Sequence, residues 1–292
     1  MRYTLRQLEV FLAVARDESV SRAAEELAMS QSAVSGSLAD LEGQFDVKLF
    51  DRVGKRLQLS ALGRSVRAAA EATLDQARAF EHALANRRDA ERLRLGATLT
   101  IGNHLAPPLM ARFMAEHPGA ELTLSIANTE EIARQVANFE IDVGLVEGEL
   151  EHGDLDVTPW LQDQLVVFCS PTHRLARKRT LTEDDLRAAT WIVRERGSGT
   201  RQTFDRAMRG LLADLTVALE LQHTEAIISA VEAGLGLGCV SPITLEDALK
   251  TERVQLCKVP HRDFRRRFLI LVHKRKHRGV GIQSWLDLCA RA

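Results

Sequence analysis

Two short helical patterns separated by a tight break lie near the start of the chain, between Ser19 and Phe45. In each, apolar residues recur at steps of three or four, the spacing of a helix with one buried face. Ser19 and Ser30 precede the two patterns and are suited to cap helices. This order predicts a helix-turn-helix unit, whose second helix lies in the major groove of DNA. The apolar positions of the second pattern are Ala33, Val34, Leu38, Leu41 and Phe45.

Short polar side chains occupy the first turns of the second helical pattern, away from its apolar stripe. Amide and hydroxyl groups there can contact base edges, since Gln pairs bidentately with adenine. Gly36 lies among them, although a glycine inside a helix costs about 1 kcal/mol relative to Ala. Either the backbone approaches DNA closely at Gly36, or the position tolerates glycine. The residues expected to contact DNA here are Ser30, Gln31, Ser32 and Ser35.

A basic segment follows the second helix. Between Lys48 and Arg67 there are six positive side chains and one carboxylate, which gives this segment a net charge of +5. Its apolar residues flank a glycine turn, as in a two-stranded wing. We expect Arg52, Lys55 and Arg56 beside that turn to contact phosphates without selecting a base sequence.

The motifs S-x-S-R-A-A-x-x-L, S-Q-S-A-V-S and K-L-F-D-R follow one another within the first sixty residues. They resemble the winged helix-turn-helix of the LysR-type transcriptional regulators of bacteria, and the rest of the chain fits that family too. The resemblance implies an activator or repressor of transcription that binds double-stranded DNA as a homodimer or homotetramer. It also implies that the chain is not an enzyme and that it needs no cofactor.

A long helix is predicted from Ser60 to about Asn86. Its apolar seam follows steps of three and four, which is typical of helices that pack in pairs. Two alternatives stay open, since the seam can contact a second subunit or the chain's own following domain. In the resembled family this element is the linker helix through which two subunits dimerise. The seam consists of Leu62, Val66, Ala69, Thr73, Ala77, Phe80 and Leu84.

After Arg92 the pattern alternates between short strands and helices, which predicts an α/β domain with parallel sheets. The resemblance implies a periplasmic-binding-protein-like effector domain of two lobes. The expected division is a DNA-binding domain (1–59), a linker helix (60–90) and an effector domain (91–292), with lobe I at 91–161 and 266–292 and lobe II at 162–265. The predicted strands are 93–98, 121–126, 141–146, 164–169, 190–194, 217–221, 237–240 and 268–273. The predicted helices are 107–116, 130–138, 182–188, 201–211, 225–233 and 282–289.

Three strand-to-helix turns of this domain carry hydroxyl groups. Hydroxyls and unpaired N–H groups at helix starts can bind a small anion, although Ser and Thr also serve as ordinary caps there. The positions are similar to a threonine-lined, sulfate-holding pocket in the cysteine-biosynthesis regulator of the family, and a sulfite-sensing branch looks nearer still. We therefore expect a small anionic effector, either a sulfur oxyanion or an organic carboxylate. The expected effector-binding residues are Thr98, Thr100, Thr129, Ser198 and Thr200.

Composition narrows the remaining function classes. The 292 residues are 45% hydrophobic with a net charge of −1, as in an ordinary globular protein. The first residues lack a secretory-signal layout and no apolar run approaches about twenty residues, so we expect a cytoplasmic protein without a membrane span. No nucleophile and base show the spacing of an enzyme site, and no metal-binding spacing appears among the histidines.

The four cysteines are scattered without a CxxC motif. We expect them to be buried thiols rather than a disulfide framework. A thiol redox sensor of the kind that occurs in this family is not indicated, because the segment from Arg196 to Thr203, where such sensors keep their reactive pair, contains no cysteine. The cysteines are Cys169, Cys239, Cys257 and Cys289.

Overall fold

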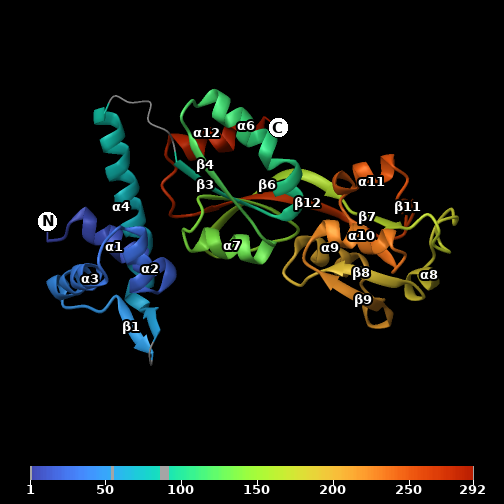
Figure 1. Cartoon of the computed structure of the whole chain (residues 1–292), viewed down its shortest axis with the longest axis horizontal. Coiled ribbons are helices and arrows are strands. Elements are labelled where there is room, and N and C mark those ends of the chain that lie inside the picture. The colour runs from blue at the N-terminus through green and yellow to red at the C-terminus, as the bar shows by residue number, and fades with distance from the viewer. Residues whose placement is uncertain (1, 54–55, 86–91, 292) are drawn as a thin grey trace.

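Three parts follow one another along the chain (Figure 1), and the computed structural model describes residues 2–53, 56–85 and 92–291. A helical head carrying a small hairpin comes first, then one long helix, and then two α/β lobes side by side. The head and long helix consist of α1 (Leu5–Asp17), α2 (Val20–Glu26), α3 (Gln31–Phe45), β1 (Phe50–Val53), β2 (Arg56–Leu59) and α4 (Ala61–Ala85).

The head forms as its pattern predicts. Thr4 and Gln7 make a reciprocal capping box at the start of α1, and Ser30 caps α3 by accepting from the N–H of Ala33 at 3.1 Å. The break between α2 and α3 includes Ala28, whose φ of 51° is left-handed and ends the first helix. The apolar stripes of the helices meet in one core with the base of the hairpin. The predicted helix-turn-helix and its two-stranded wing are confirmed.

Each lobe is a five-stranded sheet covered by helices on both faces. The first lobe has strand order β4 (Glu121–Ile126), β3 (Arg92–Ala97), β5 (Val143–Glu147), β12 (Arg265–His273) and β6 (Leu155–Gln164). Its helices are α5 (Leu99–His104), α6 (Ala106–Glu116), α7 (Thr129–Ala137) and α12 (Val280–Ala290). The second lobe has strand order β11 (Gln255–Cys257), β7 (Val166–Cys169), β10 (Leu237–Val240), β8 (Thr190–Arg194) and β9 (Thr216–Leu221). Its helices are α8 (Glu183–Arg187), α9 (Gly199–Ala207), α10 (Thr224–Glu232) and α11 (Glu246–Lys250).

The two-lobe α/β fold is confirmed, but the expectation of parallel sheets is wrong in part. Strands β3, β4 and β5 pair in parallel, as do β8, β9 and β10. In contrast, β12 is antiparallel to β5 and β6, and β7 is antiparallel to β10 and β11. The reason is that the chain crosses between the lobes twice, after β6 and before β12. At these crossings the N–H of Leu165 donates to the carbonyl of Phe264 at 3.0 Å.

Buried ion pairs hold the linker helix α4 against the first lobe. The Nζ of Lys276, just after β12, lies 2.7 Å from Asp75 of α4 and 3.2 Å from Asp142. Arg94 of β3 also donates to Asp142, at 2.8 Å. The Lys276 side chain is only 6% exposed. Burial disfavours its charged form, but the nearby carboxylates outweigh burial and raise the pKa of Lys276. The polar face of α4 therefore contacts the chain's own effector domain.

The apolar seam of α4 is divided. Val66 packs against the core of the head, whereas Leu62 and Phe80 are 41% and 65% exposed. The side chain of Leu84 lies outside the described residues. None of the helices in the described ranges is long and apolar enough to span a membrane.

The buried ion pairs predict a strong effect of Lys276→Met on stability. The substitution leaves Asp75 and Asp142 in a poorly solvated place with one cation fewer, and breaking a buried pair in this way costs about 3–5 kcal/mol. We expect urea unfolding to show such a loss. The exposed surface pair of Lys250 with Glu246 supplies the control, since Lys250→Met should change the unfolding free energy by less than about 1 kcal/mol. If the two substitutions lower the unfolding free energy equally, the ion pairs of Lys276 do not contribute more than a surface pair.

Candidate functional site

The predicted DNA-contacting side chains of α3 lie on one exposed face. Gln31, Ser32 and Ser35 are exposed, while Val34 points into the core. The hydroxyl of Ser30 is engaged as the cap and lies 3.0 Å from that of Ser32. A Cβ added at Gly36 would meet no atom within 4 Å. Packing inside this chain therefore does not require glycine at position 36. Without a side chain, Gly36 leaves the backbone of this exposed face accessible.

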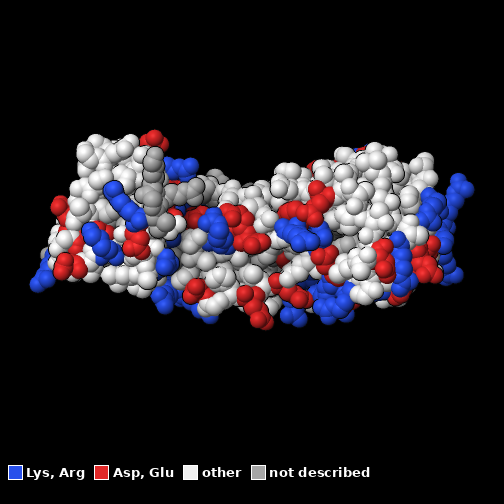
Figure 2. All heavy atoms as spheres, turned by 90° about the horizontal axis from the view of Figure 1, so that it is seen from below, with Lys and Arg blue, Asp and Glu red and all other residues white. Residues whose placement is uncertain are grey.

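The wing presents a local positive charge rather than part of a large basic surface. Lys and Arg are interspersed with Asp and Glu along the face drawn in Figure 2, in keeping with the net charge of −1. Arg52 is exposed on β1 and pairs through its backbone with Leu57 of β2. Lys55 and the side chain of Arg56 lie outside the described residues, so their expected phosphate contacts stay predictions.

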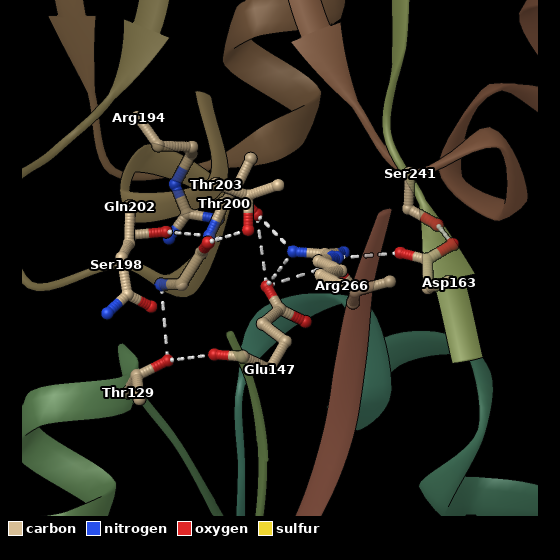
Figure 3. Close-up of polar contacts among 12 residues, drawn as sticks. Thr129, Glu147, Asp163, Arg194, Ser198, Thr200, Gln202, Thr203, Ser241 and Arg266 are labelled. Atoms are coloured by element: carbon tan, nitrogen blue, oxygen red, sulfur yellow. Dashed lines mark hydrogen bonds and ion pairs between the residues drawn. The ribbon is translucent and has the colours of Figure 1, made fainter. Parts of the chain in front are cut away.

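The predicted effector residues come together where the two lobes meet, around Glu147 at the end of β5 (Figure 3). The hydroxyl of Thr100, in the first turn of α5, donates to Glu147 Oε1 at 3.3 Å. From the second lobe, the hydroxyl of Thr200 donates to the same oxygen at 3.1 Å. Thr129 begins α7 and donates to the carbonyl of Glu147 at 2.9 Å. Ser198 caps α9 by accepting from the N–H of Thr200 at 3.2 Å. The carboxylate of Glu147 thus occupies the place expected for an anion.

Thr98 lies beside this cluster and does not join it. It is the N-terminal cap residue of α5, without a side-chain capping bond, and its N–H donates to the carbonyl of Leu145 at 2.9 Å. Its hydroxyl is buried and has no hydrogen-bond partner among the described residues. A buried hydroxyl without a partner is uncommon, because it has lost its water. The expected effector contact of Thr98 therefore stays a prediction.

Arg266 of β12 supplies the positive charge of the site. Its Nη1 lies 3.2 Å from Glu147 Oε1 and donates to the hydroxyl of Thr200 at 2.9 Å. Its Nε donates to Asp163 at 2.7 Å, and Asp163 also accepts from Ser241 at 3.0 Å. The Arg266 side chain is fully buried. Glu147 Oε2 and Arg266 Nη2 have no partner within the part of the chain that the structure describes. A small molecule offering both a donor and an acceptor would satisfy them.

Glycine permits the close approach of the two lobes at this point. A Cβ on Gly199, the first residue of α9, would overlap the carbonyl of Glu147. The N–H of Gly199 also donates to the hydroxyl of Thr129 at 3.2 Å. Gly197 just before it has a φ of 85°, which glycine adopts readily. The R-G-S-G-T-R segment therefore brings the start of α9 against the end of β5.

Glu147 and Arg266 were not among the residues predicted from the sequence. Glu147 ends an apolar strand, and Arg266 is the middle of three consecutive arginines, so neither forms a motif. A signal exists for Arg266, because it has the same strand parity as Phe268 and Ile270, whose side chains are buried. That parity points Arg266 inward, whereas Arg265 and Arg267 point outward.

In the described ranges, no three or more His, Cys, Asp or Glu residues lie close enough to hold a metal ion. His273 is buried, with the centre of its ring 4.0 Å from that of the Phe139 ring. Burial lowers the pKa of His273, which favours its neutral form. Its position is that of a core residue.

A helix-turn-helix head joined to a two-lobed α/β domain, with a polar cluster between the lobes, defines a DNA-binding regulator with an effector domain. The chain belongs to the LysR family. Residues 5–64 match the bacterial regulatory helix-turn-helix protein model of the lysR family, and residues 86–292 match the LysR substrate binding domain. The chain is therefore a transcriptional regulator and not an enzyme.

Individual relatives agree with this assignment. The HTH-type transcriptional regulator YeiE of Escherichia coli (strain K12) is 41% identical over 289 residues, covering 99% of this chain and 98% of that protein. Full-length OxyR from Pseudomonas aeruginosa has the same fold, with a TM-score of 0.76 at 20% identity over 100% of this chain and 94% of that one. The regulatory domain of CcmR from Synechocystis PCC6803, solved in complex with 2-PG, is 30% identical with a TM-score of 0.64, and covers 69% of this chain and 96% of that one.

The exposed face of α3 and the wing predict two different effects on DNA binding. Gln31→Ala should cost about 1–3 kcal/mol at one base pair and relax the preference there, because a bidentate base contact is lost. Arg52→Ala should weaken binding to all sequences alike and lower the salt slope by about one unit, because one phosphate contact is lost. Titration of an operator panel at several salt concentrations separates the two. If Gln31→Ala keeps the parent's ranking of operators, Gln31 does not contact a base.

Proposed function

We propose that this regulator binds specific DNA sites as a dimer and that a small oxyanion between its lobes changes that binding. The observation that carries the proposal is the convergence of Thr100, Thr200 and Arg266 on one carboxylate oxygen of Glu147. Two hydroxyl donors and a guanidinium, drawn from both lobes, here stabilise a negative oxygen in a buried place. An incoming oxyanion would accept from the same donors once the Glu147 side chain turns away.

The chemistry of the cluster favours a sulfur oxyanion over an organic carboxylate. Ile101, in the helix that carries Thr100, belongs to the buried core of the first lobe and supplies no apolar wall for an organic ligand. The groups around Glu147 are mostly hydroxyls, backbone N–H groups and charges, which suit a compact, highly polar ligand. The CcmR domain holding 2-PG supports the general point that a domain of this kind takes a small molecule.

The position of the cluster supports coupling to DNA binding. A cavity of about 1530 Å³ lies beside it, lined by Thr129, Ser198 and Gly199 of the lobes together with Arg16 of the head and Arg64 of the linker helix. A ligand that favours one arrangement of the lobes changes the walls of this cavity, and therefore the contacts of the head. Such a ligand shifts the equilibrium only by its difference in affinity for the two arrangements.

Calorimetry on the full-length protein with sulfite, sulfate, phosphate and benzoate tests the effector. We expect an inorganic oxyanion, with sulfite foremost, to bind once per chain. Because a hydrogen bond to a charged group contributes about 1.5–3 kcal/mol, the loss of two such bonds in Thr100→Val with Ser198→Ala should weaken binding by at least about 100-fold. Glu147→Gln should tighten it, since the competing charge is removed.

Thr216→Val, an exposed change on β9, serves as the control and should leave the affinity unaltered. If benzoate binds and none of the three inorganic anions does, the effector is an organic acid and the oxyanion proposal is wrong. If the parent and the double variant of Thr100 and Ser198 bind the oxyanion with equal affinity, these two residues do not belong to the binding site.

We place the contact between the two subunits of the proposed dimer on the exposed part of the α4 seam. Phe80 and Leu62 are large apolar side chains exposed on a long helix, and such positions favour contact with another subunit. Phe80→Asp would bury a charge against its twin and cost several kcal/mol. We expect sedimentation to show monomers for Phe80→Asp and dimers for the neighbouring control Glu81→Gln. If Phe80→Asp still sediments as a dimer, the subunit interface lies outside the α4 seam.

A further inference from the structure

Two of the four cysteines meet in the second lobe, although 88 positions separate them in the chain. Cys257 of β11 donates its thiol proton to Cys169 of β7, with the sulfur atoms 3.4 Å apart. The strands pair so that Gln255 lies opposite Cys169 and Cys257 lies opposite Val167. The two cysteines are therefore diagonal neighbours on the same face of the sheet. Cys239 and Cys289 are buried without such a partner among the described residues.

We propose that Cys169 and Cys257 form a reversible thiol–disulfide site that hydrogen peroxide oxidises. The thiolate of Cys169 attacks the peroxide, which gives a sulfenic acid on Cys169 and releases water. The thiol of Cys257 then attacks that sulfur, which forms the Cys169–Cys257 disulfide and releases a second water. Both thiols lose a hydrogen, and the peroxide takes up the two electrons.

The hydrogen bond assigns the order of these steps. Donation from Cys257 stabilises a negative sulfur on Cys169 and lowers the pKa of Cys169. The same bond, together with burial, raises the pKa of Cys257. Burial raises the pKa of Cys239, and raises that of Cys289 to about 12, so both remain unreactive thiols. Cys169 is therefore the attacking sulfur and Cys257 the resolving one.

The location of the pair allows access and reversibility. Strand β11 is three residues long and forms the edge of its sheet, where it pairs with β7. Cys169 is fully buried and Cys257 is 8% exposed, whereas Leu256 beside Cys257 is 42% exposed, so a peroxide reaches Cys169 only when β11 opens. A short edge strand opens more readily than a central one, which admits a small peroxide. Diagonal neighbours have Cα atoms roughly 7–8 Å apart, beyond the usual disulfide range, so β11 must shift on oxidation. A disulfide strained in this way is readily reduced.

The test uses the reduced full-length protein, treated with hydrogen peroxide, then unfolded and alkylated for mass spectrometry. We expect two of the four thiols to escape alkylation, a peptide joining Cys169 to Cys257, and full recovery with dithiothreitol. Cys239→Ala is the matched control and should keep that bond. Cys257→Ala should stop at a sulfenic acid on Cys169, which dimedone traps.

Circular dichroism and DNA binding of each reduced variant establish that it is folded. Oxidation of the pair should be at least tenfold faster than any modification of Cys289. Four alkylated thiols after peroxide treatment, or a bond from Cys169 to Cys239 instead, would overturn the proposal.

Discussion

The contact between Glu147 and Arg266 is the interaction on which the junction of the lobes depends. Both groups are buried, and a buried ion pair repays its desolvation only when further hydrogen bonds complete it. Here Asp163 accepts a hydrogen bond from the Nε of Arg266, while Thr100 and Thr200 donate to Glu147. Because Thr200 belongs to the second lobe and the other partners of Glu147 to the first, these bonds also hold the lobes together. A ligand that enters this place must therefore replace a structural contact, which is how binding can change the lobe arrangement.

Hydrophobic periodicity predicted most of the fold, because most elements bury one face against a single core. The strand β6 was missed for a physical reason. Its sequence, Leu155 to Gln164, contains Pro159 and several polar residues, and these suit an edge strand better than the interior of a sheet. β6 is such an edge strand, and its pairing with β12 shifts register between Phe268 and Leu269, opposite Pro159 and Leu161. The register shift interrupts the alternation of apolar and polar residues along β6, so the sequence pattern did not indicate a strand there.

The candidate site shows a sharper limit of sequence analysis. Hydroxyls at helix starts follow a local rule, so Thr100, Thr129, Ser198 and Thr200 could be predicted from the turns in which they lie. The Glu147–Arg266 pair joins residues more than a hundred positions apart, on two strands whose antiparallel pairing the alternating pattern did not predict. Charge partners of this kind depend on register and topology. The same holds for Lys276 with Asp75, and for the two meeting thiols.

The distribution of these contacts decides which part of the molecule can move. The ion pair of Lys276 with Asp75 of α4 fixes the linker helix to the first lobe, and Asp142 lies within reach of the same Lys276 ammonium in a buried place where these charges are costly to separate. The second lobe is joined to the first through the two crossing segments at Leu165 and Phe264, through the polar contacts around Glu147, and through further bonds such as those of Ser241 with Asp163 and Gln202 with Glu149. Exchange of the Glu147 contacts for a ligand therefore leaves the first lobe and the linker helix as one unit. In the proposed mechanism the second lobe would turn about the crossings. Because Ser198 and Gly199 line the cavity that also borders the head, such a rotation would change the contacts of the DNA-binding end of the molecule.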